Sequence, residues 1–102
     1  MPFAARFTFD AGSGICLWAD DDATRTAFDI PIDHHDIGLP SELAAAADRV
    51  VAQWDTCIDW SDPGGPSPWT AADREAFRTA SDALLARLRT ALGDAWVVRD
   101  DR

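Results

Sequence analysis

Two short clusters of polar residues have side chains that could support metal chemistry. Asp33-His34-His35-Asp36 is the only cluster with the residue types of a transition-metal site. Adjacent histidines on an extended chain point to opposite sides, so an ion would need further ligands from elsewhere. Asp20-Asp21-Asp22 lacks the alternating acidic spacing and the closing Glu of a calcium loop. We therefore predict no metal site, no cofactor, and a solvated loop around the two histidines.

No serine or cysteine stands in a pattern that is typical of a catalytic nucleophile. Cys16 and Cys57 lack a Cys–His signature, and no serine lies in a nucleophile elbow. The 18 carboxylates leave acid–base catalysis open, but no spacing picks out a catalytic pair. We predict that the protein is not an enzyme. A metal-dependent hydrolase that uses His34 or His35 is the catalytic alternative.

The composition is that of a strongly acidic globular protein. Its 102 residues include 18 acidic and 9 basic side chains, which gives a net charge of −9 and a pI near 4.3. The length and the 47% hydrophobic content predict a single domain over residues 1–102. A negative surface repels phosphate backbones and anionic lipids, so we expect no nucleic-acid partner and no membrane partner. A natural partner of this chain would be basic.

The apolar segments and the cysteines predict a cytoplasmic protein. Residues 1–6 lack the basic region and apolar stretch of a signal peptide. The longest apolar run, Leu43 to Ala47, is far shorter than the roughly 20 residues that cross a bilayer. Two cysteines are too few for a disulfide-stapled secreted scaffold, so we expect both thiols to be reduced and packed as small apolar residues.

The negative charge is concentrated in the first two-thirds of the chain. Residues 1–39 hold two Arg against seven Asp, a net of −5, and residues 40–69 hold one Arg against five acids, a net of −4. Residues 70–102 hold six of each and are neutral. This asymmetry indicates a candidate binding surface, although acidic surfaces also serve solubility. The predicted partner-binding residues are Asp20, Asp21, Asp22, Asp33, Asp36, Asp55, Asp59 and Asp62, with Trp60 as an aromatic anchor.

Strand-like segments at both ends of the chain predict a small sheet. Apolar residues alternate from Phe3 to Phe9, a two-glycine turn follows at 10–14, and Ile15 to Trp18 resumes the strand pattern, which predicts a hairpin. An Asp among residues 20–22 is expected to cap a short helix over 23–28. The segment 29–38 is predicted to be irregular. Residues 95–99 predict a last strand that pairs with the hairpin.

Two long helices are predicted between these strands. Apolar residues spaced by threes and fours predict a helix from Pro40 to about Asp59. A loop rich in Pro and Gly covers 60–69, and Thr70 opens a second helix that ends at Gly93. We expect Trp60 and Trp69 to fold back over the helix ends. The fold class is α+β: a small antiparallel sheet, made of the N-terminal hairpin and the C-terminal strand, packed against two long helices and one short helix.

Two segments resemble those of small bacterial proteins. The segments are Gly14-Ile15-Cys16-Leu17-Trp18-Ala19 and the loop Asp59-Trp60-x-Asp62-Pro63-x-Gly65-Pro66-Ser67-Pro68-Trp69, which an Arg/Leu-rich helix follows. The resemblance covers roughly residues 14–98. Such small acidic proteins resemble the immunity proteins of bacterial toxin systems. The resemblance implies an inhibitor that binds and neutralises a toxin, and it identifies no catalytic residue.

An acidic surface fits that inhibitory role. Toxins that act on nucleic acids or nucleotides tend to have basic clefts, which an acidic protein can occupy. Carboxylates pair bidentately with Arg, and long-range attraction speeds association. We therefore predict an immunity protein or antitoxin-like inhibitor of a basic toxin domain. The alternative is an accessory or ligand-binding domain without a toxin, which could form a homodimer through its helical face.

Overall fold

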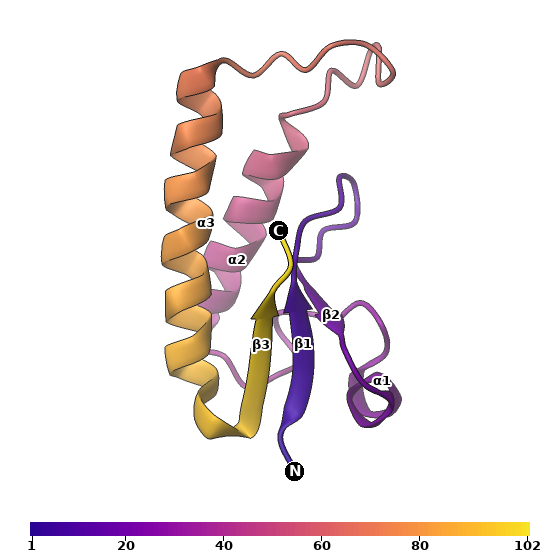
Figure 1. Ribbon diagram of the computed structural model, residues 1–102, viewed down its shortest axis with the longest axis vertical. Helices are drawn as coiled ribbons and strands as arrows, with labels where there is room; N and C mark the ends of the chain where they lie inside the picture. The colour runs from indigo at the N-terminus through magenta and orange to yellow at the C-terminus, as the bar shows by residue number, and fades with distance from the viewer.

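Three strands and three α-helices make up the protein, whose computed structural model describes all residues from 1 to 102 (Figure 1). Their order along the chain agrees with the predicted α+β class. The elements are β1 (Phe3–Phe7), β2 (Leu17–Ala19), α1 (Asp22–Phe28), α2 (Ser41–Asp55), α3 (Ala71–Leu92), the short 3-10 helix η1 (Gly93–Ala95) and β3 (Trp96–Asp100).

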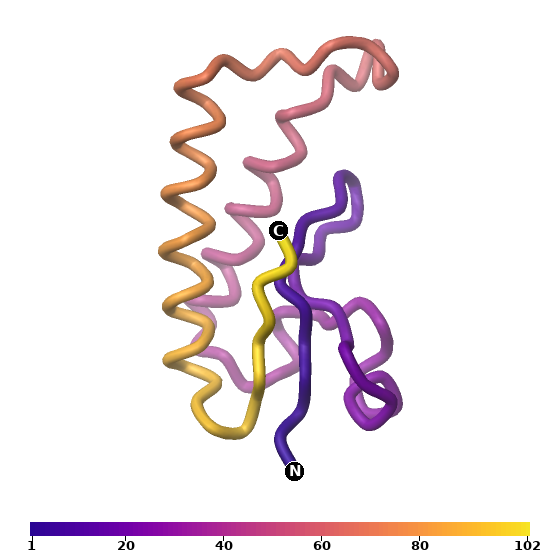
Figure 2. The backbone as a smooth tube through the Cα atoms, in the orientation of Figure 1, coloured from indigo at the N-terminus to yellow at the C-terminus, as the bar shows by residue number.

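The sheet is mixed, with β1 between β2 and β3. β1 and β2 form the predicted antiparallel hairpin, with Phe7 opposite Leu17. β3 lies parallel to β1, and Phe3 pairs with Trp96. The expectation of a wholly antiparallel sheet was therefore wrong. The parallel pairing follows from the path of the two long helices. α2 runs away from the end of the sheet where β1 begins, and α3 runs back to it, so β3 starts at the same end as β1 and runs in the same direction (Figure 2).

One face of the sheet packs against the two long helices. Alternate residues of the strands, including Ala5, Phe7 and Val98, point to this face and are buried. α2 and α3 cover it, while α1 lies beside β2, away from α3 (Figure 1). The amide of Ala4 donates to Oγ1 of the buried Thr24, which fixes α1 to β1. Leu17 of β2 and the loop residues Cys16 and Ile32 also belong to the core, and the helices supply its other members, namely Leu43, Ala46, Ala47, Val51, Leu84, Leu85, Leu88 and Leu92.

The ends of the helices follow local sequence signals, with one exception. Thr70 and Asp73 form a capping box at the start of α3, and Gly93 ends it with φ 57°, as predicted. α2 ends at Asp55, short of its predicted end. The carbonyl of Asp55, which would accept from residue 59 in a longer helix, accepts from the indole of Trp60 at 3.1 Å. The same carbonyl also accepts from the amide of Ile58, and the amides of Thr56 and Cys57 bond to carbonyls three residues earlier, so the helix closes in a tight turn.

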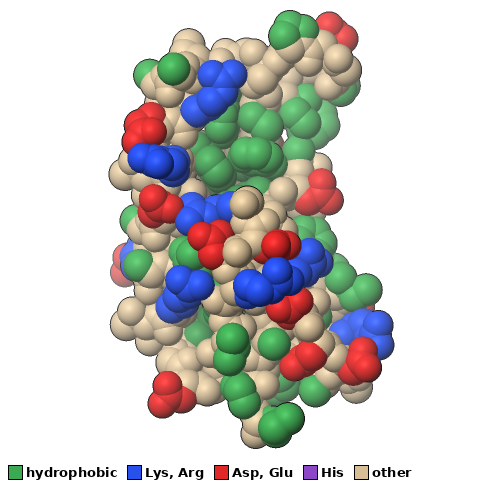
Figure 3. Space-filling model, viewed as in Figure 1, with side chains coloured by type: hydrophobic (Ala, Val, Ile, Leu, Met, Phe, Trp, Pro, Cys, Tyr) green, Lys and Arg blue, Asp and Glu red, His purple; other side chains and the backbone are tan.

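Aromatic side chains fill the space where the long helices extend beyond the sheet. Phe9 and Phe77 have ring centroids 4.9 Å apart, and Trp54 lies 5.1 Å from Phe77. A cavity of about 190 Å³ opens beside them, and Figure 3 shows apolar side chains in a hollow at this end of the molecule. None of the helices is both long enough and apolar enough to cross a membrane.

Candidate functional site

Asp20 belongs to a network of ion pairs on the sheet face that the long helices leave open. Its two carboxylate oxygens accept from Nε and Nη2 of Arg99, at 3.1 and 3.2 Å. Arg6, the register partner of Arg99 across β1 and β3, lies 4.0 Å from Asp20 and 3.4 Å from Asp101. Mixed acidic and basic side chains are visible over this face in Figure 3. The bond from Arg99 therefore neutralises Asp20 within the protein.

Asp21 and Asp22 have internal roles at the start of α1. Asp21 is the N-cap, and its carboxylate accepts from the amide of Thr24 at 2.8 Å. The side chain of Thr24, together with this amide, lowers the pKa of Asp21. Asp22 forms an ion pair with Arg25 at 2.7 Å, one helical turn later. The predicted short, Asp-capped helix is confirmed. The triple aspartate nevertheless presents less free negative charge than its sequence suggests.

His34 is buried, so the prediction of a solvated loop was wrong at this residue. Its side chain is 1% exposed. The amide of Cys16 donates to Nε2 at 3.1 Å, so Nε2 carries the lone pair and the proton lies on Nδ1. Nδ1 then donates to Oδ1 of Asp48 at 2.9 Å. This tautomer satisfies both ring nitrogens and connects the hairpin to α2.

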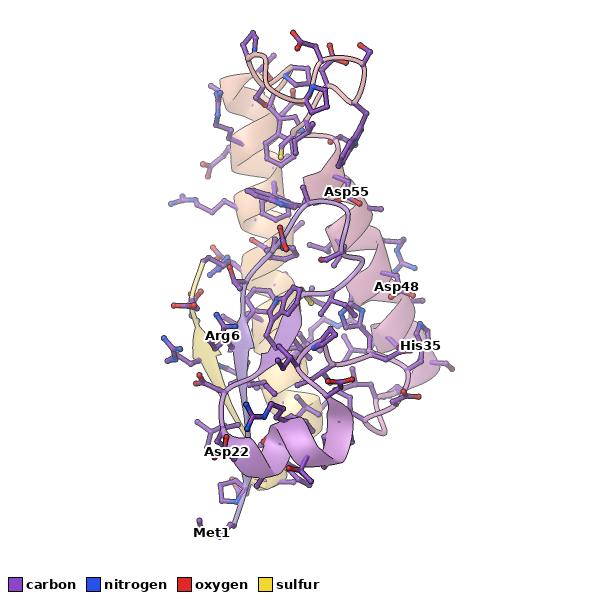
Figure 4. The ribbon with its side chains drawn as sticks, turned by 90° about the vertical axis from the view of Figure 1, so that its right-hand side faces the viewer. Met1, Arg6, Asp22, His35, Asp48 and Asp55 are labelled. Atoms are coloured by element: carbon purple, nitrogen blue, oxygen red, sulfur yellow. The ribbon has the colours of Figure 1, made fainter.

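His35 binds the other oxygen of the same carboxylate. Its Nε2 lies 2.7 Å from Oδ2 of Asp48, and its side chain is 52% exposed, with both residues on the outer side of α2 (Figure 4). The hydrogen bond to Asp48 raises the pKa of His35. Burial alone would raise the pKa of Asp48, but the bonds from His35 and His34 outweigh it and lower that pKa.

Cys16, His34 and Asp48 are hydrogen-bonded in the sequence of a Cys–His–Asp triad, but their geometry does not activate the thiol as a nucleophile. Sγ of Cys16 lies 3.4 Å from Nε2 of His34. The thiol is completely buried, and burial, reinforced by Asp48, raises its pKa to about 12. The lone pair of Nε2 already accepts from the Cys16 amide, so it is not free to take the thiol proton. The network is thus a polar connection between the hairpin, the loop 33–38 and α2.

Sequence reasoning missed this network because its members are far apart in the chain and form no short motif. His34 was predicted to lie in a solvated loop, and no motif singled out Asp48. The loop does bring Asp33 close to His35, whose amide donates to the Asp33 carboxylate at 2.9 Å. No group of three or more His, Cys, Asp or Glu side chains is arranged to hold a metal ion.

Trp60 is the aromatic residue with the most exposed side chain. It is 56% exposed, although its indole N–H donates to the carbonyl of Asp55. The carboxylate of Asp55 accepts from the amide of Gly12 at 3.0 Å, so the hairpin turn, the end of α2 and Trp60 meet at one point. Only the edge of the Trp60 indole that carries the nitrogen therefore contacts the end of α2, as predicted, while much of the ring is exposed.

The second loop tryptophan, Trp69, folds back as predicted. Its ring packs edge-on against Trp54, with centroids 5.8 Å apart, and lies 5.4 Å from Phe77. Its indole N–H donates to Oγ1 of Thr56 at 2.8 Å. Trp69 therefore joins the end of α2 to the start of α3, and only Trp60 of the pair presents its ring to solvent.

The carboxylates around Trp60, along α2 and on the loop 33–38 form what we call the acidic strip. Asp48 and Asp55 are seven residues apart on one face of α2, about 10 Å along the axis, and lie on the same side of the molecule as His35 (Figure 4). Asp22 lies on α1, toward the opposite end from Asp55 (Figure 4). The strip comprises Asp33, Asp36, Asp48, Asp55, Asp59 and Asp62, none of which forms an ion pair with an arginine.

Asp59 is held in an ordered conformation within this strip. Its carboxylate accepts from the amide of Ser61 at 3.0 Å and from the Ser61 hydroxyl at 2.6 Å. These bonds lower the pKa of Asp59 and keep it ionised beside Trp60 in the chain. The structure thus brings Asp55, Asp59 and Trp60 to one end of the molecule, while Asp33 and Asp36 lie on the loop below.

One family model matches almost the whole chain. It is described as Serratia CdiI immunity protein-like, and it covers residues 7–99. No curated protein matches the sequence. The match agrees with the resemblance to immunity proteins, which are inhibitors of toxins rather than enzymes. On this evidence the chain belongs to the Serratia CdiI immunity protein-like family.

Proposed function

We propose that the protein neutralises a bacterial toxin by binding a basic surface of that toxin with the acidic strip and Trp60. The family supplies the general role of toxin neutralisation. The observation that carries the choice of surface is the exposed Trp60 ring, which Asp55 fixes in place beside carboxylates without arginine partners. This arrangement combines an aromatic anchor with free negative charge.

The chemistry of this surface fits arginine and lysine side chains of a partner. A guanidinium that approaches Trp60 can stack on the indole face, and a neighbouring carboxylate can accept its N–H groups. Tryptophan is enriched among the residues that dominate binding energy at protein interfaces. Because Asp55 and Ser61 already hold Trp60 and Asp59, little side-chain freedom is lost when a partner binds.

Asp20, Asp21 and Asp22 already bind other groups of the protein, so they are weaker candidates for contact with a toxin. Asp20 and Asp22 are paired with arginines and add little to long-range attraction, because the net charge of each pair is zero. Asp21 keeps its charge, but its carboxylate is committed to the amide of Thr24 as the cap of α1. We therefore place the principal contacts at Asp33, Asp36, Asp55, Asp59, Asp62 and Trp60. The three aspartates at the start of α1 contribute less.

The test uses the toxin encoded beside this protein's gene and compares two sets of charge variants. The Asp55→Asn, Asp59→Asn, Asp62→Asn triple variant keeps an oxygen to accept from Gly12 and Ser61 but removes three charges. The control is Asp22→Asn, which removes one exposed charge that forms an ion pair with Arg25. We expect association of the triple variant to be about tenfold slower at low salt, with a flatter salt dependence.

Binding strength is tested separately with Trp60→Ala, which we expect to dissociate at least tenfold faster than the wild type. Co-expression then asks whether the protein relieves toxicity. Persistent toxicity without a stable complex would contradict toxin neutralisation. Equal association rates for the wild type and the triple variant would contradict the acidic strip as the contact surface.

A further inference from the structure

We propose that His35 and Asp48 form a proton-operated latch, which holds the loop 33–38 against α2 more firmly at mildly acidic than at mildly alkaline pH. The latch is a property of the folded chain alone. Only its effect on partner binding rests on the proposed function.

The fixed side of the latch is the buried contact of His34. Its two ring nitrogens are occupied by the Cys16 amide and by Oδ1 of Asp48. This contact sets the orientation of the Asp48 carboxylate and points its second oxygen outward. The outward oxygen is the acceptor for His35, at 2.7 Å.

The titrating side of the latch is His35, whose half-exposed ring exchanges protons with solvent. The charged groups that face it are Asp48 on α2 and Asp33 and Asp36 on its own loop, all of which favour a protonated ring. The Cys16 thiol faces the same carboxylate from the hairpin and is uncharged at neutral pH. Arg49, the neighbour of Asp48 on α2, is not among the groups that shift the pKa of His35.

The direction of the effect follows from the raised pKa of His35. A histidine whose pKa is higher in the folded than in the unfolded state stabilises the fold fully below its unfolded pKa, near 6.5. That stabilisation is lost as the pH rises through the higher, folded value. Protonated His35 donates a charge-assisted hydrogen bond to Asp48, whereas the neutral ring donates a weaker one.

The latch acts on two of the proposed partner contacts. Asp33 and Asp36 lie on either side of the two histidines, and the amide of Asp36 donates to the carbonyl of Asp33 at 3.0 Å. When His35 holds this turn against α2, both carboxylates keep a fixed position relative to Asp48 and Asp55. A change of pH therefore alters the order of one part of the acidic strip.

Amide hydrogen exchange in the isolated full-length protein tests the latch. The amides of His35 and Asp36, which form bonds within the turn, are compared at about pH 6 and about pH 8.5, each corrected for the intrinsic exchange rate. We expect protection in the wild type to be about two- to fivefold higher at the lower pH, the size expected of a half-exposed ion pair. Amides in the middle of α3 serve as the internal reference.

The His35→Gln variant provides the decisive comparison, because glutamine keeps an N–H donor but does not titrate. We expect its protection in the turn to be the same at both pH values. Asp48→Asn, which keeps an acceptor for His34 but removes the charge, should also lose the pH dependence. Equal protection at both pH values in the wild type, or an unchanged pH dependence in His35→Gln, would overturn the latch. A toxin that fails to bind would leave this result intact, so the two proposals fail separately.

Discussion

The ring of Trp60 lies against Gly12, so that a Cβ on this glycine would stand 3.5 Å from Cη2 of the indole. The same residues are joined through Asp55, which accepts the Gly12 amide on its carboxylate and the Trp60 indole on its carbonyl. The hairpin turn thus serves as the support of the exposed tryptophan. Changes in the turn should therefore be felt at the proposed contact surface.

Gly12 is expected to tolerate no side chain without a cost in stability. Its φ of +83° lies in the left-handed region, which costs an L residue roughly 1–2 kcal/mol. We predict that Gly12→Ala lowers the free energy of unfolding by about 1 kcal/mol, measured by urea denaturation. Gly64→Ala is the control, because Gly64 has ordinary φ and no atom within 4 Å of an added Cβ. Equal losses for both variants would show that the left-handed backbone is not the cause.

The capping box of α3 should make a measurable contribution to stability. Oγ1 of Thr70 accepts from the Asp73 amide at 3.1 Å, and the Asp73 carboxylate accepts from the Thr70 amide at 2.8 Å. Thr70→Ala removes the first bond and should destabilise the protein by about 1 kcal/mol in thermal or urea unfolding. Thr70→Ser keeps the hydroxyl and should lie close to the wild type. A serine variant as unstable as the alanine variant would refute the role of the cap.

The two cysteines should differ in their reactivity in the native protein. Cys16 is completely buried and its thiol pKa is raised to about 12, whereas Cys57 is only half-buried and its pKa is raised less. Because the thiolate is the reactive form, we expect N-ethylmaleimide to modify Cys57 first. Cys16 should react only at the rate of unfolding. Mass spectrometry of Cys57→Ser provides the check, and rapid labelling of that variant would contradict the buried position of Cys16.

Asp100 should contribute stability that depends on pH. The hydrogen bond from Arg102 lowers the pKa of Asp100 to about 2. A carboxylate with a lowered folded pKa stabilises the fold above its unfolded pKa of 3.8, and this contribution is lost as the pH falls toward 2. Since the pair is partly exposed, we expect Asp100→Asn to cost about 0.5 kcal/mol at neutral pH.

The pH comparison supplies the control for Asp100. In urea unfolding, the difference between Asp100→Asn and the wild type should shrink toward zero near pH 2. Asp94→Asn, which changes a carboxylate without an ion pair, should show no such convergence. A constant difference across this pH range would indicate that the asparagine acts through packing rather than through the lost charge.

Local signals in the sequence predicted most of the secondary structure. The hairpin, the Asp cap of α1 and the capping box of α3 depend on neighbouring residues, so they could be read from spacing alone. The direction of β3 could not be predicted in this way. It depends on how α2 and α3 reverse the chain between the strands, and no local pattern near Trp96 records that path.

The sequence indicated most of the acidic residues that belong to the candidate site, but not how they are paired with other side chains. The charge asymmetry pointed to the first two-thirds of the chain, where the acidic strip lies. Sequence could not reveal that Arg99, from the neutral last third, neutralises Asp20, or that His34 is buried against Asp48. Both contacts join residues far apart in the chain. That the chain forms a single domain stays a prediction.

β1 and β3 are neighbours in the sheet, although nearly the whole chain lies between them in the sequence. Phe3 pairs with Trp96, so one edge of β1 stays open during synthesis until the last strand leaves the ribosome. Contacts so distant in sequence slow folding and leave an unpaired edge exposed to other chains. The fold is therefore completed only after translation of β3, and protection by a newly made molecule must lag behind its synthesis.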